Sequence, residues 1–455
     1  MRFLVVTATF LLGSIGASAS ADTPPARAVT LDEAIAYADA HQPTIASARA
    51  RILATRADAD VIRSDWYPRF GASIELVGGT ANNSTATQLT PSAFDLPRIG
   101  GTKSYGPADF APSASTFVGV GARQEVFDFG RISVQASVYD AIARAEEKRI
   151  ELTKLDVVFL VSQSFYGVLA AHSVIAAADE AYTRSKLHRD FADVAVRSGL
   201  RSPIELTRAE ADLTRFDVAK IRARGNLTVA ESVLAASMGT TELQIDAKES
   251  PSSAALPTAG DSVARALRSP QVKLYEDILA AQQAQTRAAT APMRPNLFLS
   301  ASFNARSGGA SPSSGPSATY GGWVPEVPNY DVGLVFSWNI WDPAATARAA
   351  ASRAREEGAR ADVEAARQRA SHAALEAEQL VKIADEALVA LDRALDAAKA
   401  NYAQADARFR SGLGTSTEVA DAEQLQVTAE LDRASGQLQA MIARAALARA
   451  TTEGT

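Results

Sequence analysis

Cysteine is absent from the 455 residues, and histidine occurs only four times. A chain without cysteine forms no disulfide and no thiolate metal site, and it carries no acyl chain on an N-terminal cysteine. The histidines are scattered, without the spacing of H-E-x-x-H, and there is no G-x-S-x-G motif. His188 is expected to pair with Asp190 at a helix surface. These absences predict that the protein is not an enzyme and uses no cofactor and no metal.

A surplus of positive charge is also lacking. The net charge is −6, and lysine and arginine alternate with aspartate and glutamate instead of clustering. Nucleic-acid-binding proteins need a basic patch, so this charge pattern excludes nucleic acid as a partner.

Long hydrophobic runs are confined to the N-terminus. Arg2 precedes the apolar run 3–15, and the small residues of 17–21 offer cleavage sites, so residues 1–21 are predicted to be a signal peptide. No later segment is expected to be apolar enough for a transmembrane helix, which needs about 20 apolar residues. Membrane insertion would therefore have to use strands.

One short motif occurs twice in what is otherwise alanine-rich, helix-forming sequence. Arg-Ser-Gly-Leu stands at 197–200 and again at 410–413, which is 213 positions later. Each copy is followed by Ser, Thr or Pro and then by a carboxylate. A glycine that ends one helix, followed by the N-cap of the next, predicts the tip of a helical hairpin. Two such tips at a fixed offset indicate a tandem duplication.

Each repeat is predicted to run helix, two strands, long helix, tip, helix. The first repeat, 22–240, begins with a helix from Thr30 to about Ser64, with a kink or break at Pro43. It continues with strands at about 70–77 and 117–127, a long helix at 130–197, a tip at 198–202 and a helix at 203–238. After an equatorial connector at 241–260, the second repeat, 261–450, comprises a helix to about Thr290, strands at about 297–304 and 330–340, a long helix at 343–410, a tip at 411–415, a helix at 416–450 and then a tail, 451–455.

The four predicted strands alternate between apolar and polar residues. In 330–340, for example, Tyr, Val, Leu, Phe, Trp and Ile alternate with polar or small residues. A membrane barrel has this pattern, apolar toward lipid and polar toward the lumen. Aromatic residues beside the strands, including Trp66 and Phe127, would anchor the inner interface. The segments 78–114 and 306–329 are predicted to be long exposed loops.

Four strands cannot close a barrel, and an open sheet edge is not tolerated in lipid. Because small membrane barrels need about eight strands or more, the chain is predicted to oligomerise. The helices that follow the strands would then form a joint helical barrel. The fold class is therefore mixed, all-α plus membrane β.

The order of these elements, with its two Gly-Leu tips, resembles the TolC family of outer-membrane efflux proteins over nearly all of the mature chain. The resemblance implies a homotrimer, with a 12-stranded outer-membrane β-barrel (four strands per chain) continued by a long α-helical periplasmic barrel. It implies location in the cell outer membrane, in contact with its lipid and extending into the periplasm. The absence of cysteine places the chain with the unlipidated branch.

The resemblance also implies a function. It predicts the exit duct of a tripartite efflux pump or a type I secretion system, with a periplasmic adapter protein and an inner-membrane transporter as partners. Drugs, metal ions and secreted polypeptides all remain open as cargo. The alternative is a periplasmic coiled-coil scaffold or adapter without a channel, but such a protein does not need four alternating strands.

Two groups of site residues follow from the resemblance. The adapter-docking tips are expected at Gly199, Leu200, Ser202, Gly412, Leu413 and Thr415. The periplasmic gate is expected at Glu418 and Asp421, whose i,i+3 spacing places both on one helix face, so that a threefold axis would gather six carboxylates. The other interpretation is that these are ordinary solvated helix charges. Because Gly414 stands where the family often has a basic or polar lock residue, Arg201, with Glu205 one turn on, is expected to replace that residue.

Overall fold

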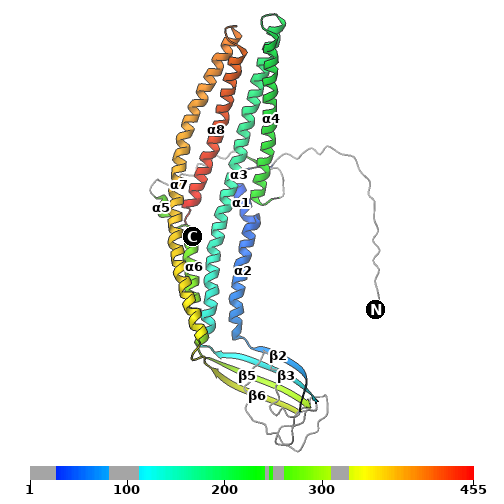
Figure 1. Ribbon diagram of the computed structural model, residues 1–455, viewed down its shortest axis with the longest axis vertical. Helices are drawn as coiled ribbons and strands as arrows, with labels where there is room; N and C mark the ends of the chain where they lie inside the picture. Colours follow the sequence, from blue (N-terminus) through cyan, green and yellow to red (C-terminus); the bar gives the residue numbers. More distant parts are fainter. Residues whose placement is uncertain (1–26, 81–111, 241–244, 249–260, 309–326, 455) are drawn as a thin grey trace, which may run out of the picture.

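The computed structural model describes residues 27–80, 112–240, 245–248, 261–308 and 327–454. The molecule is elongated, with the tips of two helical hairpins at one end and a four-stranded sheet at the other (Figure 1). One long helix of each hairpin spans the whole distance between them. The predicted signal peptide, most of both predicted loops and most of the connector lie outside the described residues.

The helices fall into two similar sets. The first set is α1 (Leu31–His41), α2 (Pro43–Arg63), α3 (Arg131–Arg197) and α4 (Pro203–Met238), and the second is α5 (Ser262–Ala266), α6 (Pro270–Ala288), α7 (Pro343–Arg410) and α8 (Ser416–Thr451). With 67 and 68 residues, α3 and α7 are each about 100 Å long at 1.5 Å per residue. In each set the long helix packs against a shorter helix near the sheet and another toward the tip (Figure 1).

Proline divides the first helix of each set. Thr30 and Glu33 form a reciprocal capping box that begins α1, and the chain breaks at an extended Gln42 before Pro43 begins α2. In the second repeat the single helix predicted from residue 261 to about 290 was wrong. Ser269 is extended, and Pro270 occupies the first turn of α6, where its missing N–H is not needed.

The sheet joins the two repeats. Its strands are β2 (Arg69–Thr80), β3 (Pro112–Phe127), β5 (Asn296–Gly308) and β6 (Val327–Ser337), in the order β2-β3-β5-β6 and antiparallel throughout. Each repeat contributes one hairpin, and β3 pairs with β5 across the repeats. Among the described residues, β2 and β6 each leave one edge unpaired.

Three strands are longer than predicted, and the fourth is shifted. β2, β3 and β5 extend into the segments predicted as loops. The prediction that the last strand reaches residue 340 was wrong, because β6 ends at Ser337. The Trp338 indole N–H donates to the Met293 carbonyl at 3.1 Å, and the Asn339 amide donates to the Pro292 carbonyl at 3.5 Å. These residues therefore bond to the turn before β5 and leave the ladder.

The two faces of the sheet are reversed relative to a soluble protein. Large apolar side chains on one face are 57–79% exposed: Phe70, Ile74, Leu76, Tyr330, Val332, Leu334 and Phe336. On the other face, Glu125, Ser300 and Ser302 are buried. An apolar exterior over a polar interior is the pattern of a strand that contacts lipid.

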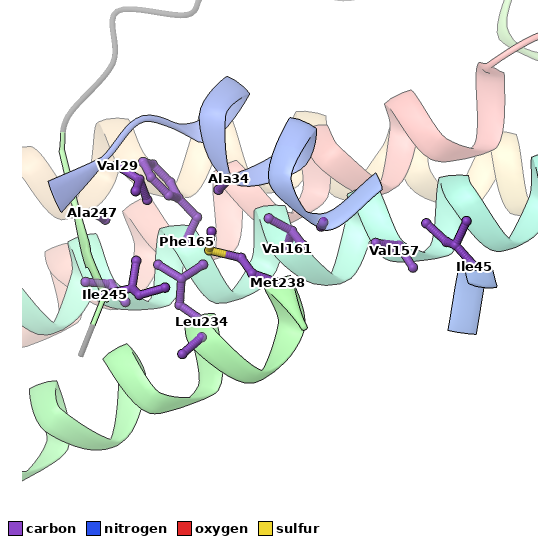
Figure 2. Packing of buried hydrophobic residues seen from close by; sticks show 13 residues of the cluster. Val29, Ala34, Ile45, Val157, Val161, Phe165, Leu234, Met238, Ile245 and Ala247 are labelled. Carbon is purple, nitrogen blue, oxygen red and sulfur yellow. The ribbon is translucent and has the colours of Figure 1, made fainter. Parts of the chain in front are cut away.

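A compact core lies midway along the helices. The short strands β1 (Arg27–Val29) and β4 (Ile245–Ala247) pair in parallel, and their apolar residues pack with Phe165, Leu234 and Met238 from α3 and α4 (Figure 2). Full burial of a side chain such as Phe165 contributes about 1.5–3 kcal/mol to the stability of the folded chain. β4 lies within the predicted connector, so this connector is anchored to the N-terminal end of the described chain.

One prediction about hydrophobic runs was wrong. Among the described helices, α3 is long and apolar enough, by length and composition alone, to cross a membrane. It packs against α1, α2, α4, α6 and α8. Part of its apolar surface therefore contacts other helices within the single chain.

Candidate functional site

The first tip is a Schellman turn. α3 ends at Arg197, Gly199 takes a left-handed φ of 75°, and its N–H donates to the Val196 carbonyl at 3.0 Å. The Leu200 N–H donates to the Ala195 carbonyl at 2.9 Å. This pair of bonds satisfies the last carbonyls of the helix, and the positive φ favours glycine.

The second tip repeats this geometry. Gly412 has a φ of 79°, its N–H donates to the Phe409 carbonyl at 3.1 Å, and the Leu413 N–H donates to the Arg408 carbonyl at 2.9 Å. α8 then begins at the N-cap Thr415, whose hydroxyl accepts a hydrogen bond from the Glu418 N–H at 3.3 Å. In the first tip, Ser202 is the N-cap residue of α4, but its side chain makes no capping bond.

Each tip presents one large apolar side chain to solvent. Leu200 is 79% exposed and Leu413 is 78% exposed. The described structure places no atom within 4 Å of a Cβ built on Gly199 or Gly412, so the space over both glycines is open. The predicted docking residues therefore lie together at the far end of the molecule from the sheet (Figure 1).

Arg201 links the two tips. Its guanidinium donates to the Gly414 carbonyl at 3.1 Å and to the Phe409 carbonyl at 3.4 Å, and it lies 4.8 Å from the centroid of the Phe409 ring. The Glu205 carboxylate is 3.4 Å from the same guanidinium. Arginine on one hairpin thus holds backbone oxygens of the other.

The absence of a side chain at residue 414 has a steric reason. A Cβ built there would lie 3.0 Å from the Phe409 nitrogen and 3.1 Å from the Arg408 Cβ. These contacts are tighter than ordinary van der Waals packing allows, and one partner is backbone. The tight turn therefore favours glycine, and the contact between hairpins uses the carbonyl of this residue.

The two predicted gate carboxylates lie on the surface of α8 in the single chain. The Glu418 carboxylate is 3.7 Å from the Arg408 Nε, and its side chain is 47% exposed. Asp421, one turn further along α8, is also exposed. Neither is held in the interior of the chain, so both are free to face a neighbouring copy or an axis.

A buried polar cluster, Arg184 with Glu423, Gln426 and Glu430, lies between α3 and α8 on the sheet side of the tips. Arg184 is 3.6 Å from the Glu423 carboxylate and 3.5 Å from that of Glu430, and the Gln426 amide donates to Glu430 at 2.8 Å. Sequence reasoning missed this cluster. The i, i+3, i+7 spacing of its three α8 members was the available signal, because it places them on one helix face.

His188 is part of the same inter-repeat contact, and its predicted pairing with Asp190 at the surface was wrong. The His188 ring is buried with its centroid 4.6 Å from that of Phe409, while Asp190 pairs with Arg189 at 3.0 Å. Burial lowers the pKa of His188. The neutral ring therefore packs as an aromatic wall in a cleft of about 430 Å³ between α3 and α7.

The buried carboxyl group of Glu423 is expected to make the stability of the folded chain depend on pH. Burial raises its pKa from 4.5 to about 7, and Arg184 opposes this only in part. From pH 4.5 to 7 the folded chain holds a proton that the unfolded chain has lost, so stability falls as pH rises through this window. We expect the Glu423→Gln variant to unfold at a higher temperature than the wild type at pH 8, with a smaller difference at pH 5.5.

Circular dichroism melts at both pH values measure this effect. Glu376→Gln, an exposed substitution on α7, is the control and should leave the pH dependence unchanged. His188, whose pKa is lowered, acts in the opposite direction in both proteins, so the difference between them isolates Glu423. Equal melting temperatures at pH 8 would contradict the prediction.

The comparisons with known proteins agree with this geometry. The family model for outer membrane efflux proteins matches residues 34–240 and 264–453. No curated protein matches the chain. The CusC structure is 18% identical over 94% of each chain, with a TM-score of 0.73.

Two further structures share the fold. The Campylobacter jejuni CmeC outer membrane channel is 14% identical over 98% of this chain and 94% of its own, with a TM-score of 0.71. The outer-membrane channel OprN is 22% identical over 93% of this chain and 90% of its own, with a TM-score of 0.68.

The family match covers most of the chain and includes both repeats. It confirms the resemblance to TolC-like proteins, the location in the outer membrane, the role as an efflux channel and the prediction that the protein is not an enzyme. It gives no support to the alternative of a periplasmic scaffold. The chain belongs to the outer membrane efflux protein family.

Proposed function

We propose that three copies of this chain form one continuous duct, a 12-stranded barrel in the outer membrane followed by a helical tunnel in the periplasm. The observation that carries the proposal is the four-stranded sheet, which has an exposed apolar face and two unpaired edges. Lipid offers no hydrogen-bond partner to an open edge. Pairing β2 of one copy with β6 of the next satisfies both edges, and three copies supply enough strands for a closed membrane barrel.

The same threefold symmetry would also arrange the helices of the three copies around one axis. α3 and α7 both begin beside the sheet and extend to the tips, with α6 and α8 packed between them (Figure 1), so closing the strands into a ring also closes the helices into one. The broad apolar surface of α3, with Leu187 and Val194 exposed in the single chain, would be covered by neighbouring helices. Many buried alanines permit such close helix packing.

The tips are the proposed docking surface for a periplasmic adapter protein, which connects the duct to an inner-membrane transporter. Two Schellman turns with exposed leucines, far from the membrane end, support this assignment. Docking there leaves the lumen continuous. The transporter, which meets the cargo first, would select it.

The proposed gate lies just beside the tips. Glu418 and Asp421 are exposed on one face of α8, and a threefold axis would gather six carboxylates from three chains. Such a ring attracts cations and disfavours anions. Arg201 would hold the two hairpins of each chain together while the gate is closed.

The assembly is tested on the detergent-solubilised mature protein. Light scattering coupled to size exclusion should give the protein mass of three chains, and the trimer should migrate on gels in a heat-modifiable form. Reconstituted protein should conduct ions across a planar bilayer. A well-folded monomer would overturn the proposal, because a single sheet cannot close.

A further inference from the structure

The polar face of the sheet carries a basic cleft where the strands meet the long helices. The cleft has a volume of about 740 Å³, and its charged lining consists of Arg69, Arg123, Arg131, Arg294, Asp65 and Glu125. We call it the junction cleft. Four guanidinium groups against two carboxylates leave an excess of positive charge, although the whole chain is acidic.

Two of the arginines are paired with the two carboxylates of the cleft. Arg69 forms an ion pair with Asp65, and Arg131 lies 3.7 Å from Glu125. Because the Glu125 side chain is only 7% exposed, its partner Arg131 is held in the wall of the cleft. The Arg131 Nε is buried without a hydrogen-bond acceptor. The Arg131 guanidinium is therefore not fully satisfied by its carboxylate partner.

The other two arginines have no carboxylate partner in the described part of the chain. The Arg123 guanidinium stacks 3.6 Å from the centroid of the Phe298 ring. Arg294 donates to the carbonyls of Phe129 and Gly130, each at 3.1 Å, which fixes it beside the start of α3. Stacking and carbonyl bonds hold these side chains in place and leave their charges uncompensated.

The strand register places like charges together. Arg69 lies directly opposite Arg123 in the β2–β3 ladder. Like charges at directly opposed positions destabilise an antiparallel pair, and such local conflicts are expected at functional sites. An anion between the two guanidinium groups would relieve this repulsion.

The position of the cleft decides what reaches it. Arg123 is on the polar face of the sheet, opposite the exposed apolar residues, so in the proposed trimeric duct it faces the lumen; this step rests on the proposed function. Three clefts would then surround the channel at the inner end of the barrel. Positive charge at low-dielectric walls raises the local concentration of anions.

We propose that the junction cleft is an anion-binding site on the transport path, for solutes that carry carboxylate or phosphate groups. Guanidinium groups bind both groups through paired N–H donors. The cleft is opposite in charge to the proposed carboxylate ring at the tips. A cargo molecule with both a cationic and an anionic group would find a complementary site at each end of the duct.

The test is calorimetric titration of inorganic tripolyphosphate into the trimer in a non-ionic detergent. We expect binding that weakens with added salt. Arg123→Gln should weaken it by about tenfold or more, as expected for loss of a charge-assisted hydrogen bond. Arg69→Gln, at a largely exposed side chain, should leave the fold intact and have a similar effect. Arg360→Gln removes the same charge from the surface of α7 and should leave the affinity unchanged.

A second arm locates the site. In bilayers of phosphatidylcholine alone, tripolyphosphate added on the extracellular side should reduce the current of the wild type and have less effect on Arg123→Gln. If the arginines instead hold lipid headgroups, anionic phosphatidylglycerol will copurify with the wild type and be lost from Arg123→Gln, and the current will not respond. That result would overturn the luminal site.

The two proposals fail separately. A trimer of correct mass that binds no tripolyphosphate, or binds it equally in both cleft variants, overturns the junction cleft and leaves the duct intact. A monomer that binds tripolyphosphate through Arg123 overturns the duct and the luminal position of the cleft together.

Discussion

Gly412→Asp and Gly199→Asp are each expected to reduce export to background while the trimer still assembles. Both glycines have left-handed φ values, 79° and 75°, and open space around them. Aspartate tolerates this backbone conformation better than most residues. The turn should therefore survive, and the new carboxylate would project from the apex of the tip where the adapter must approach.

Cross-linking to the adapter and export of a pump substrate are the measurements. Gly358→Asp is the matched control, because this exposed glycine lies within α7 with equally open space and far from the tip in sequence. It should leave both readouts unchanged. Wild-type export by either tip variant would show that the adapter docks elsewhere.

Arg201→Ala is expected to raise the resting conductance of the channel about tenfold. The guanidinium contributes two hydrogen bonds to backbone carbonyls of the other hairpin, together with its contact to the Phe409 ring. Losing hydrogen bonds to a charged group costs about 1.5–3 kcal/mol, which is enough to change a gate equilibrium tenfold or more. Arg201→Lys should be intermediate, because it keeps the charge and loses the planar fork.

Single-channel recording measures this change. Arg208→Ala is the control, since the Arg208 side chain donates one hydrogen bond of 3.3 Å, to the Thr417 hydroxyl across the same hairpins, in the described part of the chain. Glu418→Gln combined with Asp421→Asn should weaken cation selectivity in the same recordings. Unchanged conductance in Arg201→Ala would remove this residue from the gate, and unchanged selectivity would return the two carboxylates to ordinary surface positions.

The tips could be predicted from sequence because their determinants are local. A glycine that must adopt a positive φ, followed by a helix-capping residue, specifies a turn within a few positions. The alternating strands were equally visible, since a period of two persists over eight or more residues. The ends of the strands could not be predicted, because β6 ends where the Trp338 side chain bonds to a carbonyl 45 positions away.

The buried contacts between the repeats could not be predicted. His188 was assigned to Asp190 by sequence proximity, although residues two apart on a helix do not face each other. Its actual neighbour, Phe409, comes from the other repeat. The β1–β4 pair is equally hidden, because strands of three residues carry no periodicity and lie more than 200 positions apart.

The β3–β5 pairing sets an order for folding. These two strands are separated in sequence by α3, α4, α5 and α6, so the sheet cannot form until that whole helical segment has been made and has returned to the membrane end. Contacts of such long sequence separation form slowly. Until they form, two apolar hairpins with open edges remain separate in the periplasm. The chain therefore depends on protection from aggregation during this interval, although its finished helices carry many solubilising charges.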